Sequence, residues 1–320
     1  MRRYLLFITI TLTIFGCSRE KTPRAEVPGE RQVIKHQVPP FDKKRAFDDL
    51  TAQVAFGPRT AGSTAHDQCL NFLQVEMNKY ADAVNLQTFD VAGYGNEHLR
   101  LTNVISSFNL QSPTRILLLA HWDSRPRADQ DPDPAKQKQG VPGANDGASG
   151  VAVLMEIARA LKSSPPPVGV DMLFDDGEDY GKEGDNDRYL LGTRYFARHL
   201  PDGFHPAFGI LLDMVGDKQL EILREPNSMR DAPDIVDLVW STARDLGVYQ
   251  FIESVQRPVL DDHLPLNEAG IRTIDLIDFN YPDATNRYWH TTQDTPDKCS
   301  PESLEAVGTV LLNVIFTYSG

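Results

Sequence analysis

Three short and almost entirely apolar runs constrain the fold of this chain most strongly. Residues 116–120 read ILLLA, residues 170–174 read VDMLF, and residues 208–215 read FGILLDMV. Runs of this kind are typical of strands that are covered on both faces, as in a parallel sheet. Helical patterns lie between these runs, so strands alternate with helices. We therefore predict an α/β fold with a single domain, in which helices cover both faces of a mostly parallel central sheet.

The remaining segments extend this pattern. A helix is predicted to begin at Asp146, because apolar residues recur at helical spacing from Val151 to Leu161. Residues 125–143 hold many Asp, Pro, Gln and Gly residues, which predict a long loop. The other predicted helices are 46–54, 64–80, 190–199, 232–246 and one that closes the chain, and the other predicted strands are 84–91, 99–108, 221–223 and 272–279.

The N-terminal residues look like a targeting segment and not like part of the fold. A basic start, MRR, precedes an apolar stretch at 4–15 that is too short to span a bilayer comfortably. The stretch ends in Gly16-Cys17 and resembles a bacterial lipoprotein signal, with Cys17 as the lipidated residue. An ordinary secretory signal and an uncleaved anchor are the alternatives.

These features divide the chain into three parts. We predict a signal peptide at 1–16, a flexible tether at 17–40 and the folded domain at 41–320. The protein is expected to be exported to the bacterial cell envelope and to face the periplasm. Its lipid anchor would be its only contact with the membrane.

Composition restricts the partners and the crosslinks of the domain. The net charge is −13 and the sequence pI is about 5.0, which argues against a nucleic-acid partner because nucleic acids need a basic face. Besides Cys17 the chain has only Cys69 and Cys299, which lie in distant segments. We expect both to be small buried residues and not to form a disulfide.

A dense group of acids follows one of the apolar runs. Residues 174–179 read FDDGED, so four acids crowd the end of a strand. Buried carboxylates repel one another unless they are paired, but they suit a metal site in which one acid binds the ion and its neighbour moves protons. His121, Asp146, Asp213 and His290 also lie near the ends of apolar runs. Because the carboxyl ends of parallel strands meet at one edge of the sheet, we predict the site there.

Asp146, Asp179 and His290 are the predicted zinc ligands. Zinc takes nitrogen and oxygen donors, and a catalytic zinc keeps one position open for water or substrate. Glu178 is the predicted general acid and base, because a metal and burial can poise its pKa for proton transfer. In residues 259–265, VLDDHLP, paired acids lie among apolar residues, which favours a role in the site over a loop salt bridge.

Further polar residues have alternative places around these ligands. Asp123 lies two residues after His121 and could orient that histidine, or the two could serve a second metal. Asp213 could bind a second metal or act as a buried acid that shares a proton. Asp175 and Asp176 are expected to shape the exit from the strand or to stay solvated.

With these residues in place, the chain resembles the zinc aminopeptidase superfamily and, within it, the glutaminyl-peptide cyclotransferases. The motifs that carry the resemblance occur in the family's order and span nearly the whole domain, from about residue 40 to 318. They are AHWDS at 120–124, GANDGASG at 143–150, GED at 177–179, LDMVG at 212–216, DDHLP at 261–265 and YWHT at 288–291.

The resemblance implies a cyclase that converts an N-terminal glutamine to pyroglutamate. One zinc, held by the three predicted ligands, would polarise the γ-carbonyl of the glutamine. Glu178 would take a proton from the attacking amine and deliver it to departing ammonia, while Asp213 and Asp261 form an acidic network and Trp289 walls the pocket. The implied partners are peptides or exported proteins that begin with glutamine.

Two points leave the reading open. Animal cyclases carry a Trp in the loop after the acid pair, and this chain has none there, so Tyr180 or Tyr189 would have to replace it. His121 and Asp213 also complete the five-ligand set of a two-zinc aminopeptidase, in which Asp146 bridges the ions. That peptidase, which would hydrolyse the peptide bond with a bridging water, is the alternative function.

Overall fold

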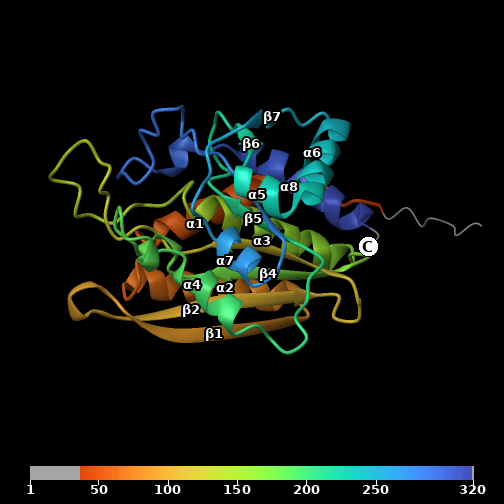
Figure 1. Cartoon of the computed structure of the whole chain (residues 1–320), viewed down its shortest axis with the longest axis horizontal. Coiled ribbons are helices and arrows are strands. Elements are labelled where there is room, and N and C mark those ends of the chain that lie inside the picture. Colours follow the sequence, from red (N-terminus) through yellow and green to blue (C-terminus); the bar gives the residue numbers. More distant parts are fainter. Residues whose placement is uncertain (1–36, 319–320) are drawn as a thin grey trace, which may run out of the picture. The chain divides into compact units, whose positions relative to one another are not determined.

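A six-stranded sheet with the order β1-β2-β4-β3-β5-β8 runs through the molecule (Figure 1). The four strands β4, β3, β5 and β8 are parallel, whereas β1 and β2 extend the sheet in antiparallel pairing. The mostly parallel sheet is therefore confirmed, with an antiparallel edge at the strands predicted for 84–91 and 99–108. The strands are β1 (Ala83–Ala92), β2 (His98–Phe108), β3 (Arg115–His121), β4 (Gly169–Asp175), β5 (Gly209–Asp213) and β8 (Thr273–Ile277).

The computed structural model describes residues 37–318, and these residues fall within one compact unit. The predicted signal peptide 1–16, Cys17 and most of the tether 17–40 lie outside the described residues. Within 37–318, no helix has both the length and the hydrophobicity needed to cross a bilayer. Cys69 and Cys299 are buried free thiols, as predicted.

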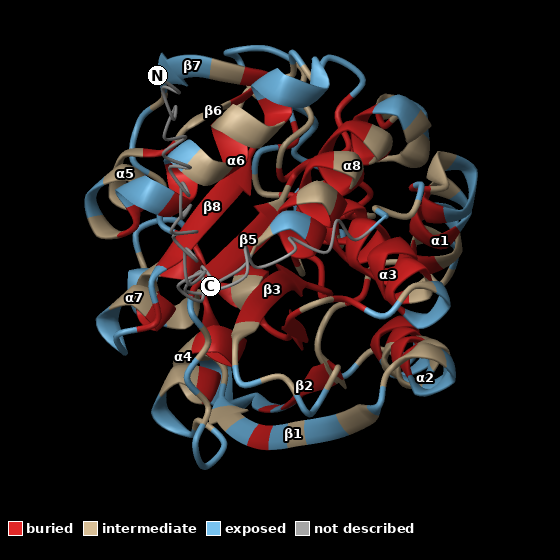
Figure 2. Cartoon of the chain, turned by 90° about the vertical axis from the view of Figure 1, so that its right-hand side faces the viewer, coloured by how far each residue is buried: buried red, intermediate tan, exposed pale blue. Residues whose placement is uncertain are grey.

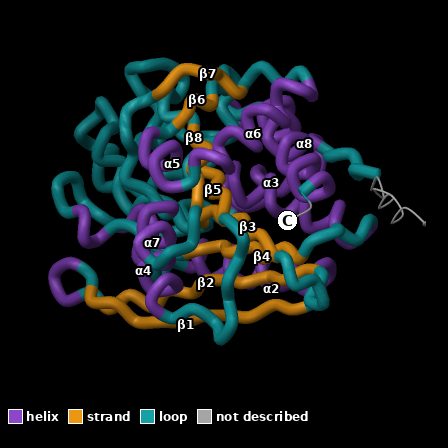
Figure 3. Tube along the Cα trace, turned by 45° about the vertical axis from the view of Figure 1, so that its right-hand side comes forward, coloured by secondary structure: helices purple, strands orange, loops and turns teal. Residues whose placement is uncertain are grey.

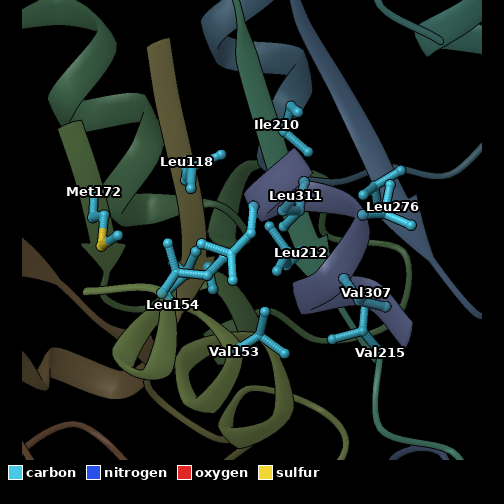
Figure 4. Packing of buried hydrophobic residues seen from close by; sticks show 14 of the residues in the cluster. Leu118, Val153, Leu154, Met172, Ile210, Leu212, Val215, Leu276, Val307 and Leu311 are labelled. Carbon is cyan, nitrogen blue, oxygen red and sulfur yellow. The ribbon is translucent and has the colours of Figure 1, made fainter. Parts of the chain in front are cut away.

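Alternation along the strands divides the core between the two faces of the sheet. Successive side chains of a strand point to opposite faces. Leu118 and Leu212 therefore pack into the larger apolar cluster with the helices α3 (Ala148–Ser163) and α8 (Pro301–Thr317), as Figure 4 shows. Their neighbours Leu119 and Leu211 pack into a smaller cluster on the other face. Burial on both faces explains why these strands read as continuous apolar runs.

Helices cover both faces, as predicted (Figure 2). On the side of the larger cluster lie α1 (Lys43–Ala55), α2 (Thr64–Tyr80), α3 (Ala148–Ser163) and α8 (Pro301–Thr317). The other face carries α4 (Leu191–Arg198) and α7 (His263–Glu268). Near β8 lie α5 (Pro226–Asp231) and α6 (Pro233–Leu246), together with a second, two-stranded parallel sheet of β6 (Ile222–Arg224) and β7 (Phe251–Val255) (Figure 3).

The start of α3 differs from the prediction. The helix begins at Ala148 and not at Asp146, because Gly147 has a φ of 99°, which an α-helix does not accommodate. Asp146 therefore lies in the turn before the helix. Further along, a Cβ atom on Gly150 would come within 2.2 Å of the carbonyl oxygen of Leu212. Only glycine at this position lets α3 lie directly against the main chain of β5.

Candidate metal centre and active site

The predicted site residues come together beyond the carboxyl ends of the parallel strands. His121 and Asp213 are the last residues of β3 and β5. Glu178 and Asp179 lie in the 3-10 turn that follows β4, and His290 lies in the segment between β8 and α8. A cavity of about 380 Å³ opens at this edge, and its lining includes Asp146, Glu178, Asp179, Asp213, Asp261, Trp289 and His290.

Asp146, Asp179 and His290 form the first group of metal-binding geometry. The Nε2 atom of His290 lies 3.3 Å from Asp179 Oδ1 and 3.6 Å from Asp146 Oδ2. Asp146 Oδ2 and Asp179 Oδ2 are buried and accept no hydrogen bond from any residue within 37–318. Unpaired buried carboxylate oxygens are costly unless a cation offsets them. With two carboxylates and an imidazole as donors, this group fits zinc.

The electrostatics of this first group favour an ionised ligand. Burial alone would raise the pKa of Asp179, but the charges of His290 and Arg125 outweigh it and hold that pKa well below its usual range. The pKa of Asp146, in contrast, is raised by burial and by the neighbouring charge of Asp179. A bound cation would lower this cost by stabilising both carboxylates.

His121, Asp146 and Asp213 form a second group of the same kind, which shares Asp146 with the first. The Nε2 atom of His121 lies 3.2 Å from Asp146 Oδ1 and 3.3 Å from Asp213 Oδ1. Its Nδ1 atom lies 3.3 Å from Asp123 Oδ1, the place predicted for a residue that orients the histidine. Asp123 also accepts hydrogen bonds from the backbone N–H groups of Glu178 and Asp179, at 3.2 and 3.4 Å. It thereby links β3 to the acid pair.

Glu178 and Asp261 are two acids of the cavity whose pKa values are raised. Burial, and then the negative charge of Asp179, raise the pKa of Glu178 well above its usual range. Burial and the charge of Asp213 do the same to the pKa of Asp261. Asp261 Oδ1 accepts a 2.6 Å hydrogen bond from the N–H of Asp262, while its Oδ2 is buried without a partner among the described residues. Both side chains are therefore suited to proton transfer.

Aromatic side chains form one wall of the cavity. The ring of Trp289 stacks on His290 with 3.6 Å between centroids, which places the indole directly beside a predicted ligand. His290 itself has a φ of 55°, an uncommon conformation for a residue other than glycine and one that often occurs at functional sites. Tyr189 also lines the cavity, whereas Tyr180 lines a different one. Of the two tyrosines named as replacements for the absent tryptophan, Tyr189 is therefore the one that lines the active-site cavity.

The structure adds an arginine that sequence reasoning missed. Arg125 is 1% exposed, and its Nη1 donates to Asp179 Oδ1 at 2.6 Å. Its Nε and Nη2 donate to the two carboxylate oxygens of Asp129, each at 2.7 Å, and Nη2 also donates to the Tyr189 hydroxyl at 3.0 Å. A single arginine at the start of a polar loop gives no periodic signal. The composition indicated only the loop 125–143 as a whole.

The loop that begins with Arg125 also supports the segment of His290. The N–H of Gln130 donates to the carbonyl of His290 at 3.2 Å, and Asp131 Oδ2 accepts from the N–H of Thr292 at 3.0 Å. In Figure 1 this loop (yellow) and the segment after β8 (blue) lie on the same side of the sheet. The loop therefore contacts both Asp179 and the His290 segment.

Two more buried residues hold the turn of Asp146. Asp294 accepts hydrogen bonds from the N–H groups of Asn145 and Asp146, at 2.8 and 3.2 Å. Arg59, which is fully buried, donates to the carbonyls of Pro142 and Gly143, each at 2.8 Å. No local pattern indicated Asp294, and Arg59 lies between the helices predicted for 46–54 and 64–80.

Of the two alternatives expected for Asp175 and Asp176, the solvated one was wrong, because neither side chain is exposed. Both are completely buried. The carboxylate of Asp176 contacts His66 Nε2 at 3.0 Å and accepts from the N–H of Thr102 at 2.7 Å. Burial, and then the charge of Asp262, raise the pKa of Asp175 well above its usual range.

The segment DDHLP contributes one residue to the cavity and two to the interior. Asp261 lines the cavity, as expected from a role in the site. Asp262 is buried and receives a hydrogen bond from the hydroxyl of Thr193. His263 is buried with its Nε2 3.3 Å from Glu225, so it lies in the interior and not in the cavity lining.

Known proteins share this fold. The model of peptidase family M28 matches residues 103–315. The glutaminyl cyclase of Bacteroides thetaiotaomicron, crystallised with N-acetylhistamine, is 38% identical and superposes with a TM-score of 0.84, covering 88% of this chain and 100% of that one. A Zn-dependent exopeptidase from Parabacteroides distasonis gives the same values.

Curated sequences give more distant matches. The glutaminyl-peptide cyclotransferase of the snake Boiga dendrophila is 24% identical over 256 residues, which are 68% of this chain and 65% of that protein. The chain spans 42% to 72% of the length of the curated relatives that it matches, with an aminopeptidase at the lower limit. The chain therefore belongs to peptidase family M28 and is related to the bacterial glutaminyl cyclases, as the sequence motifs predicted.

Proposed function

We propose that the chain is a zinc-dependent glutaminyl-peptide cyclotransferase, which converts the N-terminal glutamine of peptides or exported proteins to pyroglutamate and releases ammonia. One observation carries this proposal. Three carboxylates, Glu178, Asp213 and Asp261, line the same cavity as Trp289 and the metal-binding group. Cyclisation moves a proton from an amine to a leaving group within one substrate residue, and it needs acids on the walls of a small cavity. The related bacterial cyclases support the proposal.

The reaction forms one bond and breaks another at the same carbon atom. The free α-amine of the glutamine attacks the carbon of its own γ-amide, and the C–N bond to the departing amino group breaks. Glu178 accepts the proton of the attacking amine and returns it to the departing group, which leaves as ammonia. Asp213 and Asp261 hold the polar groups of the substrate, and Trp289 packs against its apolar stem. No proton is gained or lost overall.

The zinc is assigned to Asp146, Asp179 and His290, with one ion per chain. When bound, it supplies a positive charge that polarises the γ-carbonyl oxygen. The chain's own part is to keep both carboxylates in place: Arg125 donates to Asp179, and Asp294 holds the backbone of Asp146. On this assignment His121 and Asp123 support the ligands from outside, since Asp123 bonds both to His121 and to the acid pair.

A two-zinc aminopeptidase is the second candidate. The observation that favours it is the second metal-binding group, His121, Asp146 and Asp213, which shares Asp146 with the first. The related exopeptidase from Parabacteroides distasonis is consistent with this candidate. On this reading Glu178 would deprotonate a water and not an amine.

A peptide assay separates the two candidates. The purified chain is incubated with a peptide that begins with glutamine, and the product is followed by mass spectrometry. A loss of 17 Da, roughly the mass of one ammonia, without shortening supports the cyclase. Release of free N-terminal amino acids from the same peptide would refute it. Metal analysis adds a second measurement, because the proposal expects one tightly bound zinc and the peptidase two.

The proposed location is the bacterial cell envelope, with lipid attached to Cys17. The basic start, the short apolar stretch at 4–15 and Gly16-Cys17 support a signal peptide at 1–16, followed by a tether at 17–40 and the catalytic domain at 41–320. The variant Cys17→Ser tests the anchor: the enzyme should move from the membrane fraction to the soluble periplasmic fraction. An unchanged membrane fraction would exclude lipidation at Cys17.

A further inference from the structure

Apart from the predicted ligand His290, one basic side chain lines a cavity whose other charged residues are acids. Arg257 follows β7 and lines the active-site cavity together with six acids: Asp146, Glu178, Asp179, Glu183, Asp213 and Asp261. No other lysine or arginine among residues 37–318 lines this cavity. Arg257 is exposed, and its guanidinium forms neither an ion pair nor a hydrogen bond with the part of the chain that the structure describes. Its charge is therefore available to a ligand.

The position of Arg257 is set by an aromatic contact. Its guanidinium carbon lies 4.6 Å from the centre of the Phe279 ring, a distance typical of a cation–π interaction. Phe279 meets Trp289 edge to face at 5.2 Å, and Trp289 stacks on His290 at 3.6 Å. Three consecutive contacts therefore connect the metal-binding group to the arginine. A guanidinium on an aromatic face keeps its N–H edges free for two parallel hydrogen bonds to a carboxylate.

The distance from His290 to Arg257 along these contacts matches the length of the few substrate residues that follow the reacting glutamine. The three contacts measure 4.6, 5.2 and 3.6 Å between centres. Their combined length is no more than that of about four residues of extended chain, at roughly 3.3–3.6 Å per residue. A peptide whose first residue occupies the cavity beside His290 therefore has its next residues near Arg257. A carboxylate there would otherwise face the acids of the cavity, including the exposed Glu183.

The geometry points to a carboxylate subsite at Arg257, which binds a negative group on the residues that follow the N-terminal glutamine. This inference rests on the proposed cyclase function and specifies its substrates. The carboxylate has two sources: the side chain of an Asp or Glu in the second or third position, or the C-terminus of a very short peptide. Both present the same planar group to the guanidinium.

Matched peptides test the subsite and separate the sources. The zinc-loaded full chain is assayed with Gln-Glu-Ala-amide against Gln-Gln-Ala-amide, which differ only in the side-chain carboxylate. Gln-Ala-Ala with a free C-terminus against its amide tests the terminal carboxylate. An exposed ion pair changes an affinity by up to about fivefold, so we expect kcat/KM to favour the charged member of at least one pair by about threefold to fivefold, through KM. The preference should shrink at high salt.

Variants assign the preference to Arg257. In Arg257→Gln the preference should disappear, and in Arg257→Lys part of it should return. Arg244→Gln, which removes an exposed arginine of α6 outside the cavity, should keep the full preference. Equal losses for charged and neutral peptides in Arg257→Gln would overturn the inference, because they would mean that the side chain only supports the wall. A wild-type chain that does not distinguish the paired peptides would overturn it as well.

A binding measurement distinguishes a failure of the carboxylate subsite from a failure of the cyclase proposal. The affinities of the same peptides are measured by calorimetry in the wild type and in Arg257→Gln. If no peptide is cyclised but the charged peptides bind more tightly through Arg257, the cyclase proposal fails and the subsite stands. If all peptides are cyclised and bound alike, the subsite fails and the cyclase proposal stands.

Discussion

His121 and Asp213 are the last residues of β3 and β5, whereas Asp179 and His290 lie in irregular segments after β4 and β8. We call the first pair the strand half of the site and the second pair the loop half. Asp146 belongs to both metal-binding groups. The strand half is held by the hydrogen bonds between β3, β4, β5 and β8 in the middle of the sheet. The loop half depends on side chains such as Arg125 and Asp131.

This difference shows which part of the site is positioned by the sheet itself and which part needs additional contacts. Strand ends are fixed by the same packing that forms the core, so the strand half is in place once the sheet has formed. The loop half needs additional contacts and, on our proposal, the metal itself. Substitutions that leave the core intact should therefore disturb zinc binding mainly through the loop half.

The largest effect is expected at Glu178, which lies next to Asp179 of the loop half. The variant Glu178→Gln keeps the shape of the side chain but removes the acid and base, so kcat for cyclisation should fall by about 10²–10⁴-fold, the usual contribution of such a group. Zinc content should stay unchanged. Ammonia release and metal analysis measure the two quantities.

Glu268→Gln, an exposed residue at the end of α7, is the control for Glu178→Gln and should keep full activity. A Glu178→Gln variant that retains its zinc and loses less than tenfold in kcat would remove the proton-transfer role.

The second prediction concerns the support of the loop half. In Arg125→Gln the ionised form of Asp179 loses its 2.6 Å hydrogen bond, and the Asp129 carboxylate loses its arginine partner. Residues that orient a ligand contribute about 10–100-fold to metal affinity, so we expect zinc to bind more weakly by that factor. Competition with a chelator measures it.

Arg115→Gln is the matched control for Arg125→Gln. Arg115 forms a comparable pair with Asp171, its Nη2 lying 2.8 Å from Asp171 Oδ1, but it lies at the opposite end of β3. This variant should lower stability and leave zinc affinity unchanged. If both variants weaken zinc equally, the effect is a general loss of stability and the special role of Arg125 is refuted.

The smallest effect is expected in the strand half. On the one-zinc proposal, His121→Ala should leave one zinc per chain and change its affinity by less than about tenfold, less than the loss of an orienting residue can cost. Native mass spectrometry counts the ions in the wild type and the variant. A fall from two zincs to one would instead identify His121 as a ligand and favour the aminopeptidase.

Much of this architecture could be predicted from the sequence. Runs such as 116–120 and 208–215 are apolar because both faces of the parallel strands are buried, so the runs indicate the strands and their ends. The positions of His121 and Asp213 follow directly from those ends. The short helix α7 and the strand β7 were not predicted, because α7 has only six residues and includes Pro265, and β7 carries the polar Glu253 and Ser254.

Other features depend on contacts between distant segments. Asp176 is paired with His66, which lies 110 residues away in the chain, and no local pattern indicates that partner. The same holds for Arg125 and Asp179, which are 54 residues apart. Solvation was therefore one of the two alternatives expected for Asp175 and Asp176, although the fold buries both and pairs Asp176 with His66.

The contact of Gly150 with the carbonyl of Leu212 has a consequence for how such a site can change. Leu212 directly precedes Asp213, and Gly150 lies four residues after Asp146, so this backbone contact fixes how close the segments that carry the two carboxylates lie. The dimensions of the site are thus a property of the main chain. Ligands and nearby side chains can be exchanged, and one chemistry replaced by another, while the spacing stays constant.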